Sequence, residues 1–315
     1  NSVTTETDSE VADTMSRATL SGKELDATRG DSLGGALKQI SGVRTIETGT
    51  VAKPVIHGMH SNRVLILFDG LRHEAQSWGI DHAPEIDPFS ADKISVVNVS
   101  EKIRYGPDAI GGVILVSPAP VEELSRVRGE VHGIQVSNGT QVIGALKLRG
   151  GVPGLDDTGF RLQLSGKRAG ALSTPTYVLD NTGVEEFNAS LAVGVKKERW
   201  GVSLFGSRYT TTFGLFTGLV SENVTQFEEA IRSDLPRNID FYTFEYDIER
   251  PRQEVVHSIV KSDAYWIVPE FGRIDAMVSY QQNERQEFDL VRRSILNGPQ
   301  LDLTLQTTSG ELQWK

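Results

Sequence analysis

The stretch GFRLQLSGKRAG, residues 159–170, alternates apolar and polar side chains from one position to the next. Its apolar positions include Phe160, Leu162 and Leu164, and the positions between them carry Arg161, Gln163 and Ser165. A period of two residues is typical of a β-strand that presents different chemistry on its two faces. The sequence therefore predicts an extended strand here.

Similar alternation recurs along the second part of the chain. We expect about eight strands, near residues 130–137, 141–151, 159–168, 185–197, 200–212, 252–267, 272–286 and 301–315. Short connections such as ERWG and VPEFG alternate with long ones, the longest being residues 213–250, although SNGT is short where a long loop is expected. Short turns at one end and long loops at the other are typical of outer-membrane barrels.

The long 213–250 connection has two further features. Thr225 and Glu228 have the spacing of a capping box, which predicts a short helix. The segment also holds eight acidic and three basic residues, and so carries half of the chain's net charge of −10. An acidic loop attracts cations, although a run of charge is more often a solvated surface.

Composition excludes several classes of protein. The 315 residues contain no cysteine, which excludes thiolate metal sites and disulfides. The acidic balance, with a pI near 5.2, argues against binding nucleic acid. No run of 18 apolar residues predicts a membrane helix, and no signal peptide is present, so Asn1 suggests a processed or trimmed chain. The G-x-S-x-G, P-loop and H-E-x-x-H motifs are absent, so we expect no enzyme.

The chain divides near residue 120. Residues 1–14 are polar and acidic and predict a flexible tail, residues 15–120 predict a small α+β domain, and residues 121–315 hold the alternating strands. Within the α+β domain, Asp31 or Ser32 is expected to cap a helix that ends at Gly42. An eight-stranded barrel has no room inside for a domain of about 100 residues. The two parts therefore lie side by side, or the strands begin a larger barrel whose C-terminal strands are missing, which we favour.

Several segments of the first domain resemble the plug domain of TonB-dependent outer-membrane receptors. They are SLGGALKQISGV (32–43), RVLILFDGLR (63–72), DHAPEIDPFSADKISVV (81–97) and RYGPDAIGGVILVSP (104–118). The resemblance implies an α+β plug inside an antiparallel transmembrane β-barrel, 22-stranded in the family, in the bacterial outer membrane. The later segments ERPRQEVVHSIVK (249–261) and NERQEFDLVRRS (283–294) are similar to a subgroup found in Bacteroidetes-like bacteria.

The resemblance also implies a function, which is active import of a scarce nutrient. The partner would be TonB of the inner-membrane TonB–ExbB–ExbD complex, together with outer-membrane lipids, and a surface lipoprotein is a further candidate partner. We expect the cargo to be a metal ion or metal chelate, such as zinc, a siderophore or haem, with no intrinsic cofactor. The alternatives are a SusC-like glycan or peptide importer with a lipoprotein partner, a non-transporting adhesin, and a soluble metallohydrolase.

Candidate binding residues gather around WGIDHAPEIDP, residues 78–88. The carboxylate of Asp81 and the imidazole of His82 are suitable ligands for a divalent transition metal. The pair also matches the metal-binding pair of the zinc-uptake branch of the family, which implies a metal site. We expect His73, Trp78 and Glu85 to contact the same cargo. The alternative is an ordinary polar turn, in which His82 and Glu85 hold the loop against the barrel wall.

Overall fold

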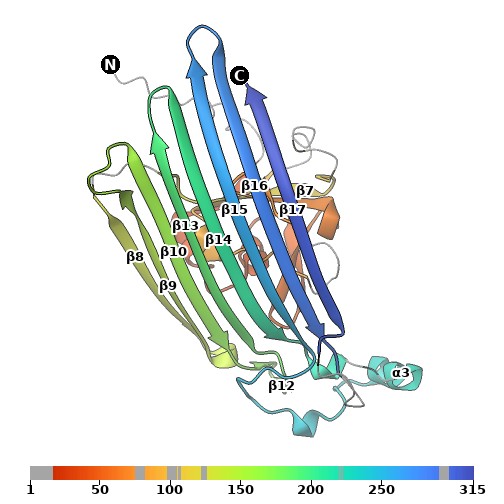
Figure 1. Cartoon of the computed structure of the whole chain (residues 1–315). Coiled ribbons are helices and arrows are strands. Elements are labelled where there is room, and N and C mark those ends of the chain that lie inside the picture. The colour runs from red at the N-terminus through yellow and green to blue at the C-terminus, as the bar shows by residue number, and fades with distance from the viewer. Residues whose placement is uncertain are drawn as a thin grey trace.

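The protein consists of a small mixed domain, the plug, and a long curved β-sheet, the wall (Figure 1). The computed structural model describes residues 17–74, 82–97, 105, 108–121, 126–219, 221, 223–290 and 298–315. The predicted tail at residues 1–14 lies outside the described residues. So does most of EKIRYG, residues 101–106, for which the sequence suggests a single helical turn.

The plug is built on a five-stranded sheet in the order β1-β6-β7-β4-β5. Its strands are β1 (Arg17–Ser21), β4 (Val64–Phe68), β5 (Leu71–Arg72), β6 (Lys93–Val97) and β7 (Gly112–Ser117). Strands β4 and β7 pair in parallel, and the other neighbours are antiparallel. Strand β4, with the sequence VLILF, is almost entirely buried, as its continuous apolar run predicts.

Two short helices and a hairpin complete the plug. Helix α1 spans Gly22–Asp26, helix α2 spans Leu33–Leu37, and β2 (Val43–Thr48) pairs with β3 (Val51–Ile56). The side chain of Ser32 caps α2 by accepting a hydrogen bond from the Gly35 backbone N–H at 3.3 Å. Gly42 has φ +86°, in the left-handed region that favours glycine, and lies at the turn into β2.

The wall is one antiparallel sheet of eight strands in which every strand pairs with its neighbour along the chain. Its strands are β8 (Arg128–Val136), β9 (Gln141–Gly151), β10 (Thr158–Ala169), β13 (Val184–Lys196), β14 (Trp200–Gly214), β15 (Arg252–Val268), β16 (Gly272–Phe288) and β17 (Leu301–Trp314). These are the eight strands expected from the alternation. The sheet is open, with β8 and β17 at its edges, and thus forms part of a barrel.

Smaller elements lie in the connections at one end of the wall. The two-stranded pair β11 (Leu172–Ser173) and β12 (Val178–Leu179) lies there, near helix α3 (Val224–Arg232) (Figure 1). The predicted helix is present, but Asn223 caps it rather than Thr225. The Asn223 side chain accepts from the Gln226 backbone N–H at 2.9 Å, so the helix begins one residue before Thr225.

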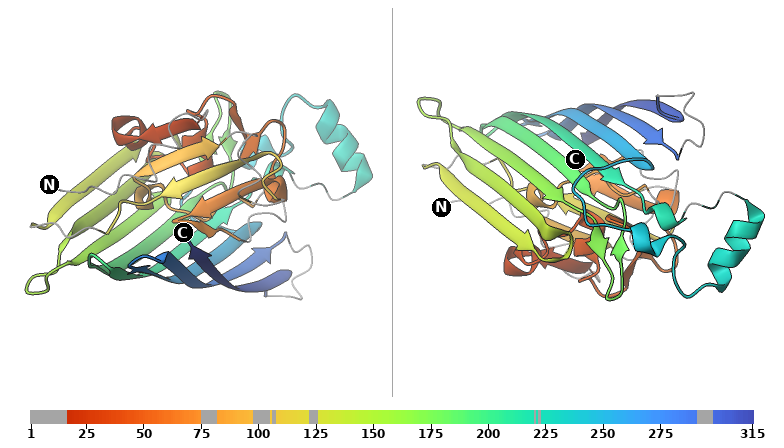
Figure 2. Two further views of the ribbon diagram at one scale, coloured as in Figure 1. Left: turned by 90° about the horizontal axis from the view of Figure 1, so that it is seen from above. Right: turned by 90° about the horizontal axis from the view of Figure 1, so that it is seen from below.

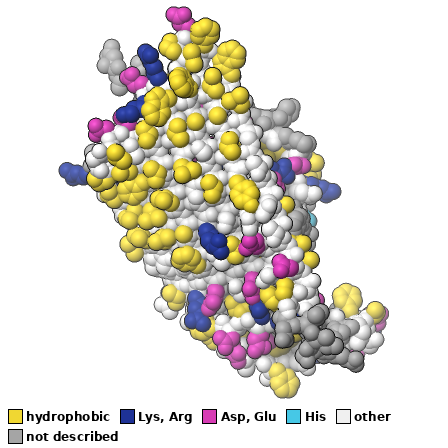
Figure 3. All heavy atoms as spheres, viewed as in Figure 1, with side chains coloured by type: hydrophobic (Ala, Val, Ile, Leu, Met, Phe, Trp, Pro, Cys, Tyr) yellow, Lys and Arg dark blue, Asp and Glu magenta, His cyan; other side chains and the backbone are white. Residues whose placement is uncertain are grey.

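The two faces of the wall have opposite chemistry. The outer face carries exposed apolar side chains over most of its height, and charged ones gather toward its two ends (Figure 3). Exposed apolar residues on the strands include Val131, Phe187, Leu191, Leu204, Val260 and Val278. The inner face buries polar side chains, including Gln163, Asn188, His257, Gln281, Asn283 and Arg285. Apolar-out and polar-in is typical of a membrane barrel and opposite to a water-soluble sheet.

The plug lies against the concave inner face of the wall (Figure 2). Part of the contact is apolar, because Phe205 and Ile259 of the wall join the plug's main core cluster. Phe205 packs edge-on against Phe68 of the plug, with ring centroids 5.6 Å apart. The remaining contact is polar and contains the candidate site. Among the described residues, no helix is long and apolar enough to cross a membrane.

Candidate functional site

Only part of the predicted WGIDHAPEIDP site can be placed, because Trp78 and Asp81 lie outside the described residues. His82 is buried, with 5 % of its surface exposed, and its Nε2 donates to Oε1 of Glu287 in β16 at 3.0 Å. The loop that begins at His82 therefore contacts the wall directly. That the Asp81–His82 pair binds metal stays a prediction.

Glu85 is the most extensively bonded of the predicted site residues. Its Oε1 accepts from Nη2 of Arg285, and its Oε2 accepts from Nδ2 of Asn283 at 2.8 Å and from Nδ1 of His257 at 3.1 Å. All four side chains are buried. Three wall residues on two strands therefore hold one plug carboxylate.

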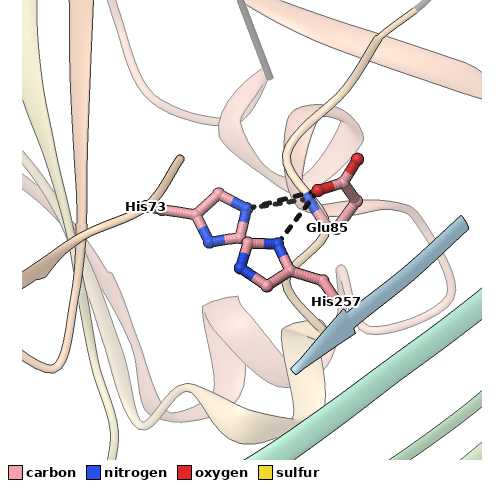
Figure 4. Close-up of side chains that lie close together, drawn as sticks. All are labelled: His73, Glu85 and His257. Carbon is pink, nitrogen blue, oxygen red and sulfur yellow. Dashed lines mark hydrogen bonds and ion pairs between the residues drawn. The ribbon is translucent and has the colours of Figure 1, made fainter. Parts of the chain in front are cut away.

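His73 lies next to this carboxylate (Figure 4). Its Nε2 accepts a hydrogen bond from the Glu85 backbone N–H at 3.3 Å and is 3.8 Å from Oε2 of the same residue. Its ring stacks on that of His257, with centroids 4.4 Å apart and planes inclined by 22°. His73 and Glu85, which the sequence places in one site, are thus brought together, but with His257 rather than with His82.

Local structure explains the position of each group. His73 follows β5, and its backbone N–H bonds to the Ile66 carbonyl of β4 at 2.9 Å, so the plug sheet positions it. In the wall, His257 of β15 is paired with Asn283 of β16, and both face inward. Arg285 lies two residues further along β16, on the same face because side chains alternate along a strand.

Asp87 anchors the other end of the same loop. Its Oδ1 accepts from the Phe89 backbone N–H at 3.0 Å, and its Oδ2 accepts from Gln163 and Ser165 of β10. The loop of residues 82–87 is therefore attached to the wall through His82, Glu85 and Asp87, toward β16 on one side and β10 on the other.

The buried charges of the plug are perturbed in different directions. Burial, with a smaller contribution from nearby His257, lowers the pKa of His73 to about 3, so its imidazole is neutral. Burial alone would raise the pKa of Glu85, but the hydrogen bond from His257 and the charge of Arg285 outweigh it, and the pKa is lowered. Burial raises the pKa of Asp87 despite its hydrogen bonds.

The sequence did not identify the wall side of this site. His257, Asn283 and Arg285 occupy inward positions of alternating strands, where polar residues are ordinary. Their residue types gave no further signal, because Gln253, Lys261 and Gln281 occupy inward positions of the same strands. His73, Glu85 and His257 each offer a donor atom within 4.8 Å of the others, a set of imidazole and carboxylate groups that suits a transition-metal ion.

The plug matches a known protein family. Residues 10–113 match the model of the TonB-dependent receptor plug domain. The vitamin B12 transporter of Photobacterium profundum is 25 % identical over 193 residues, covering 58 % of this chain and 30 % of that protein. The vitamin B12 transporter of Vibrio vulnificus is 33 % identical over 106 residues, covering 32 % of this chain and 17 % of that protein.

Solved structures share the fold of the plug and wall together. The ferric yersiniabactin uptake receptor of Yersinia pestis aligns with a TM-score of 0.65 and 13 % identity, covering 95 % of this chain and 45 % of that one. The ferric citrate transporter FecA aligns with a TM-score of 0.64 and 15 % identity, covering 88 % and 41 %. The copper transporter OprC aligns with a TM-score of 0.57 and 18 % identity, covering 89 % and 49 %.

The chain thus spans less than half the length of each of these relatives. Its N-terminal domain matches the plug family in sequence, and its wall follows the receptor barrels in fold. We conclude that residues 10–113 match the TonB-dependent receptor plug domain and that the plug and the partial barrel together have the fold of the TonB-dependent receptors.

Proposed function

We propose that this protein takes part in TonB-dependent import of a nutrient across the bacterial outer membrane. The observation that carries the proposal is the plug domain bound to the polar inner face of a wall whose outer face is apolar. An apolar outer face suits contact with lipid. A domain held in the lumen by polar contacts suits a gate that an energised partner moves.

TonB is the proposed partner, reached from the N-terminal side through the segment at residues 1–14. The cargo we propose is a metal ion or metal chelate. Vitamin B12, ferric citrate and copper are the cargoes after which similar transporters are named, and each contains a metal. Asp81 and His82 carry donor groups that suit a metal ion. The pair is also similar to that of the zinc-uptake branch, and both points support metal as cargo.

His82 is the residue that we place in contact with the cargo, together with Asp81. Its partner Glu287 adds a second carboxylate from the wall, 3.0 Å from the imidazole. A plug imidazole and a wall carboxylate can both ligate a divalent cation. The assignment to a Bacteroidetes-like subgroup stays a prediction, and a SusC-like importer would be indicated instead by co-purification of a surface lipoprotein.

The test is uptake in a host that lacks its own zinc receptor. Cells expressing the full receptor should accumulate radioactive zinc from a chelator-buffered medium, and deletion of TonB should abolish the accumulation. His82→Ala should reduce uptake, while the amount of folded receptor in the outer membrane stays the same. Uptake equal to that of cells without the receptor would refute zinc as cargo, and uptake independent of TonB would refute the proposed mechanism.

A further inference from the structure

Two imidazoles and one carboxylate meet where the plug contacts the wall, and they come from both bodies. His73 and Glu85 belong to the plug, and His257 belongs to β15 of the wall. All three side chains are at least nine-tenths buried. Figure 4 shows one nitrogen of each ring directed toward the Glu85 carboxylate. This group does not include Asp81 or His82.

The distances within the group suit a small tetrahedral ion. Oε2 of Glu85 is 3.1 Å from Nδ1 of His257 and 3.8 Å from Nε2 of His73. Four donors placed tetrahedrally about 2.0–2.1 Å from a zinc ion are about 3.4 Å from one another. The two distances bracket that value, so only small side-chain movements separate this arrangement from a ligated one.

The orientation of both rings favours ligation. Nε2 of His73 accepts a long hydrogen bond, 3.3 Å, from the Glu85 backbone N–H, so the ring proton is on Nδ1 and Nε2 has the unprotonated form that ligation needs; a bound ion would replace this hydrogen bond. In the part of the chain that the structure describes, Nδ1 of His73 and Nε2 of His257 are buried without a hydrogen-bond partner. Neither of these two atoms is the one directed at Glu85, so each ring forms its hydrogen bonds through the nitrogen that would ligate the ion.

The surroundings supply a fourth donor, and Arg285 neutralises the charge of the Glu85 carboxylate. The Asn283 carboxamide is 2.8 Å from Oε2 of Glu85 and 3.4 Å from Nδ1 of His257, and a half-turn of the amide would direct its oxygen into the group. Arg285 bonds to Oε1 of Glu85, which leaves Oε2 for an ion. A cavity of about 20 Å³, lined in part by Glu85, Asp87, Tyr209 and His257, adjoins the group and is large enough for one water.

We propose that His73, Glu85 and His257 form a binding site for a divalent transition-metal cation of the zinc class, which bridges the plug to strand β15. The ion takes the place of the proton on Nδ1 of His257, and the neutral ring then carries its proton on Nε2. Because its ligands come from both bodies, the bound ion holds the plug against the wall. The site is distinct from the proposed cargo contact at His82 and does not depend on zinc being the cargo.

The experiment measures zinc binding by the detergent-solubilised receptor after treatment with a chelator. We expect His73→Gln and His257→Gln each to weaken zinc binding at one site by about tenfold or more. Removing a group that only orients a ligand already lowers metal affinity by about tenfold, and removing the ligand itself should lower it at least as much. Gln281→Leu is the matched control, since it removes a buried wall contact to the plug, the 2.8 Å hydrogen bond from Gln281 to the Arg72 carbonyl, but no ligand of this group and no residue of the proposed cargo contact. X-ray absorption of the zinc-loaded control should show two imidazole ligands.

Zinc should also raise the unfolding temperature of the parent and of Gln281→Leu, but not that of His73→Gln, because only an ion bound to both bodies stabilises their contact. If one of the two histidine variants fails to fold, the other variant and the absorption spectrum still test the proposed site. Binding lost in Gln281→Leu alone, unchanged binding in both histidine variants, or a zinc site without imidazole would overturn the proposal. Loss of zinc uptake with this binding intact would instead count against the proposed function.

Discussion

Oε2 of Glu85 in the plug and Nδ1 of His257 in the wall lie 3.1 Å apart, although 172 positions separate the two residues in the chain. The Glu85 carboxylate is also bonded to Arg285, so a buried negative charge of the plug is neutralised by a buried positive charge of the wall. Removing one member of such a pair leaves the other charge buried without compensation. The attachment of the plug to the wall can therefore be tested by substituting one member of this pair.

Arg285→Met should destabilise the protein strongly. The substitution retains the length and apolar stem of the side chain but leaves Glu85 without its buried counter-charge, at a cost of about 3–5 kcal/mol. Urea denaturation followed by plug-specific proteolysis measures the effect. Arg273→Met is the control, because Arg273 pairs with Asp275 and is about half exposed, so its loss should cost less than about 1 kcal/mol. Equal stability of the two variants would contradict the prediction.

The stability of the metal-free protein should fall as the pH drops below about 6.5, the unperturbed histidine pKa. His73 has a pKa lowered to about 3 in the folded protein, so it stays neutral there while the unfolded chain binds a proton. The unfolding free energy then decreases by up to about 1.4 kcal/mol per pH unit until the folded protein also takes up the proton. Glu85 and His257 face the His73 ring, and both are retained in a variant that replaces only His73.

His73→Asn is the variant that isolates this effect. The difference between parent and variant should depend on pH between about 5 and 6.5, above the range in which ordinary carboxylates titrate. Chemical denaturation at a series of pH values, with a chelator present throughout, gives that difference. Parallel stability curves for the two proteins over this range would show that His73 is not held neutral by the fold.

Gly34→Ala should destabilise the plug although alanine is the better helix former. A Cβ at Gly34, in α2, would lie 1.9 Å from the carbonyl oxygen of Ala52 in β3, and backbone cannot move aside as a flexible side chain can. The gain in helix propensity of about 1 kcal/mol is smaller than the overpacking cost of about 1–3 kcal/mol. Gly133→Ala is the control, because nothing lies within 4 Å of the added carbon. Thermal unfolding of both variants tests the difference.

His82→Ala should lower the affinity for zinc at the proposed cargo site by at least about tenfold, equivalent to about 1.4 kcal/mol. The imidazole is the stronger donor of the Asp81–His82 pair for this metal, and the variant also frees Glu287 from its contact. Isothermal titration of His82→Ala and Asp81→Ala against the parent measures the change. If both variants bind zinc as the parent does, residues 81–82 are only a polar turn.

The sequence by itself determined the secondary structure of the wall and the beginning of helix α2. Each wall strand must present different chemistry to its two faces, and this requirement is local, so the period of two residues marks strands such as β10 and β15 directly. Ser32 caps α2 through a contact only three residues away. The sequence predicts that Thr225 caps α3. Asn223 caps it instead, because its side chain reaches the Gln226 backbone N–H.

Only the tertiary structure decided which inward side chains meet the plug. His257 and Asn283 are adjacent because β15 and β16 pair in one particular register, and a shift by one residue would put the two side chains on opposite faces of the sheet. Glu85 reaches them because the plug sheet positions His73 and because Asp87 attaches the loop to β10. The sequence marked His73 and Glu85 but not His257, since a contact across 172 positions depends on how the plug and the wall pack and leaves no periodic trace in either segment.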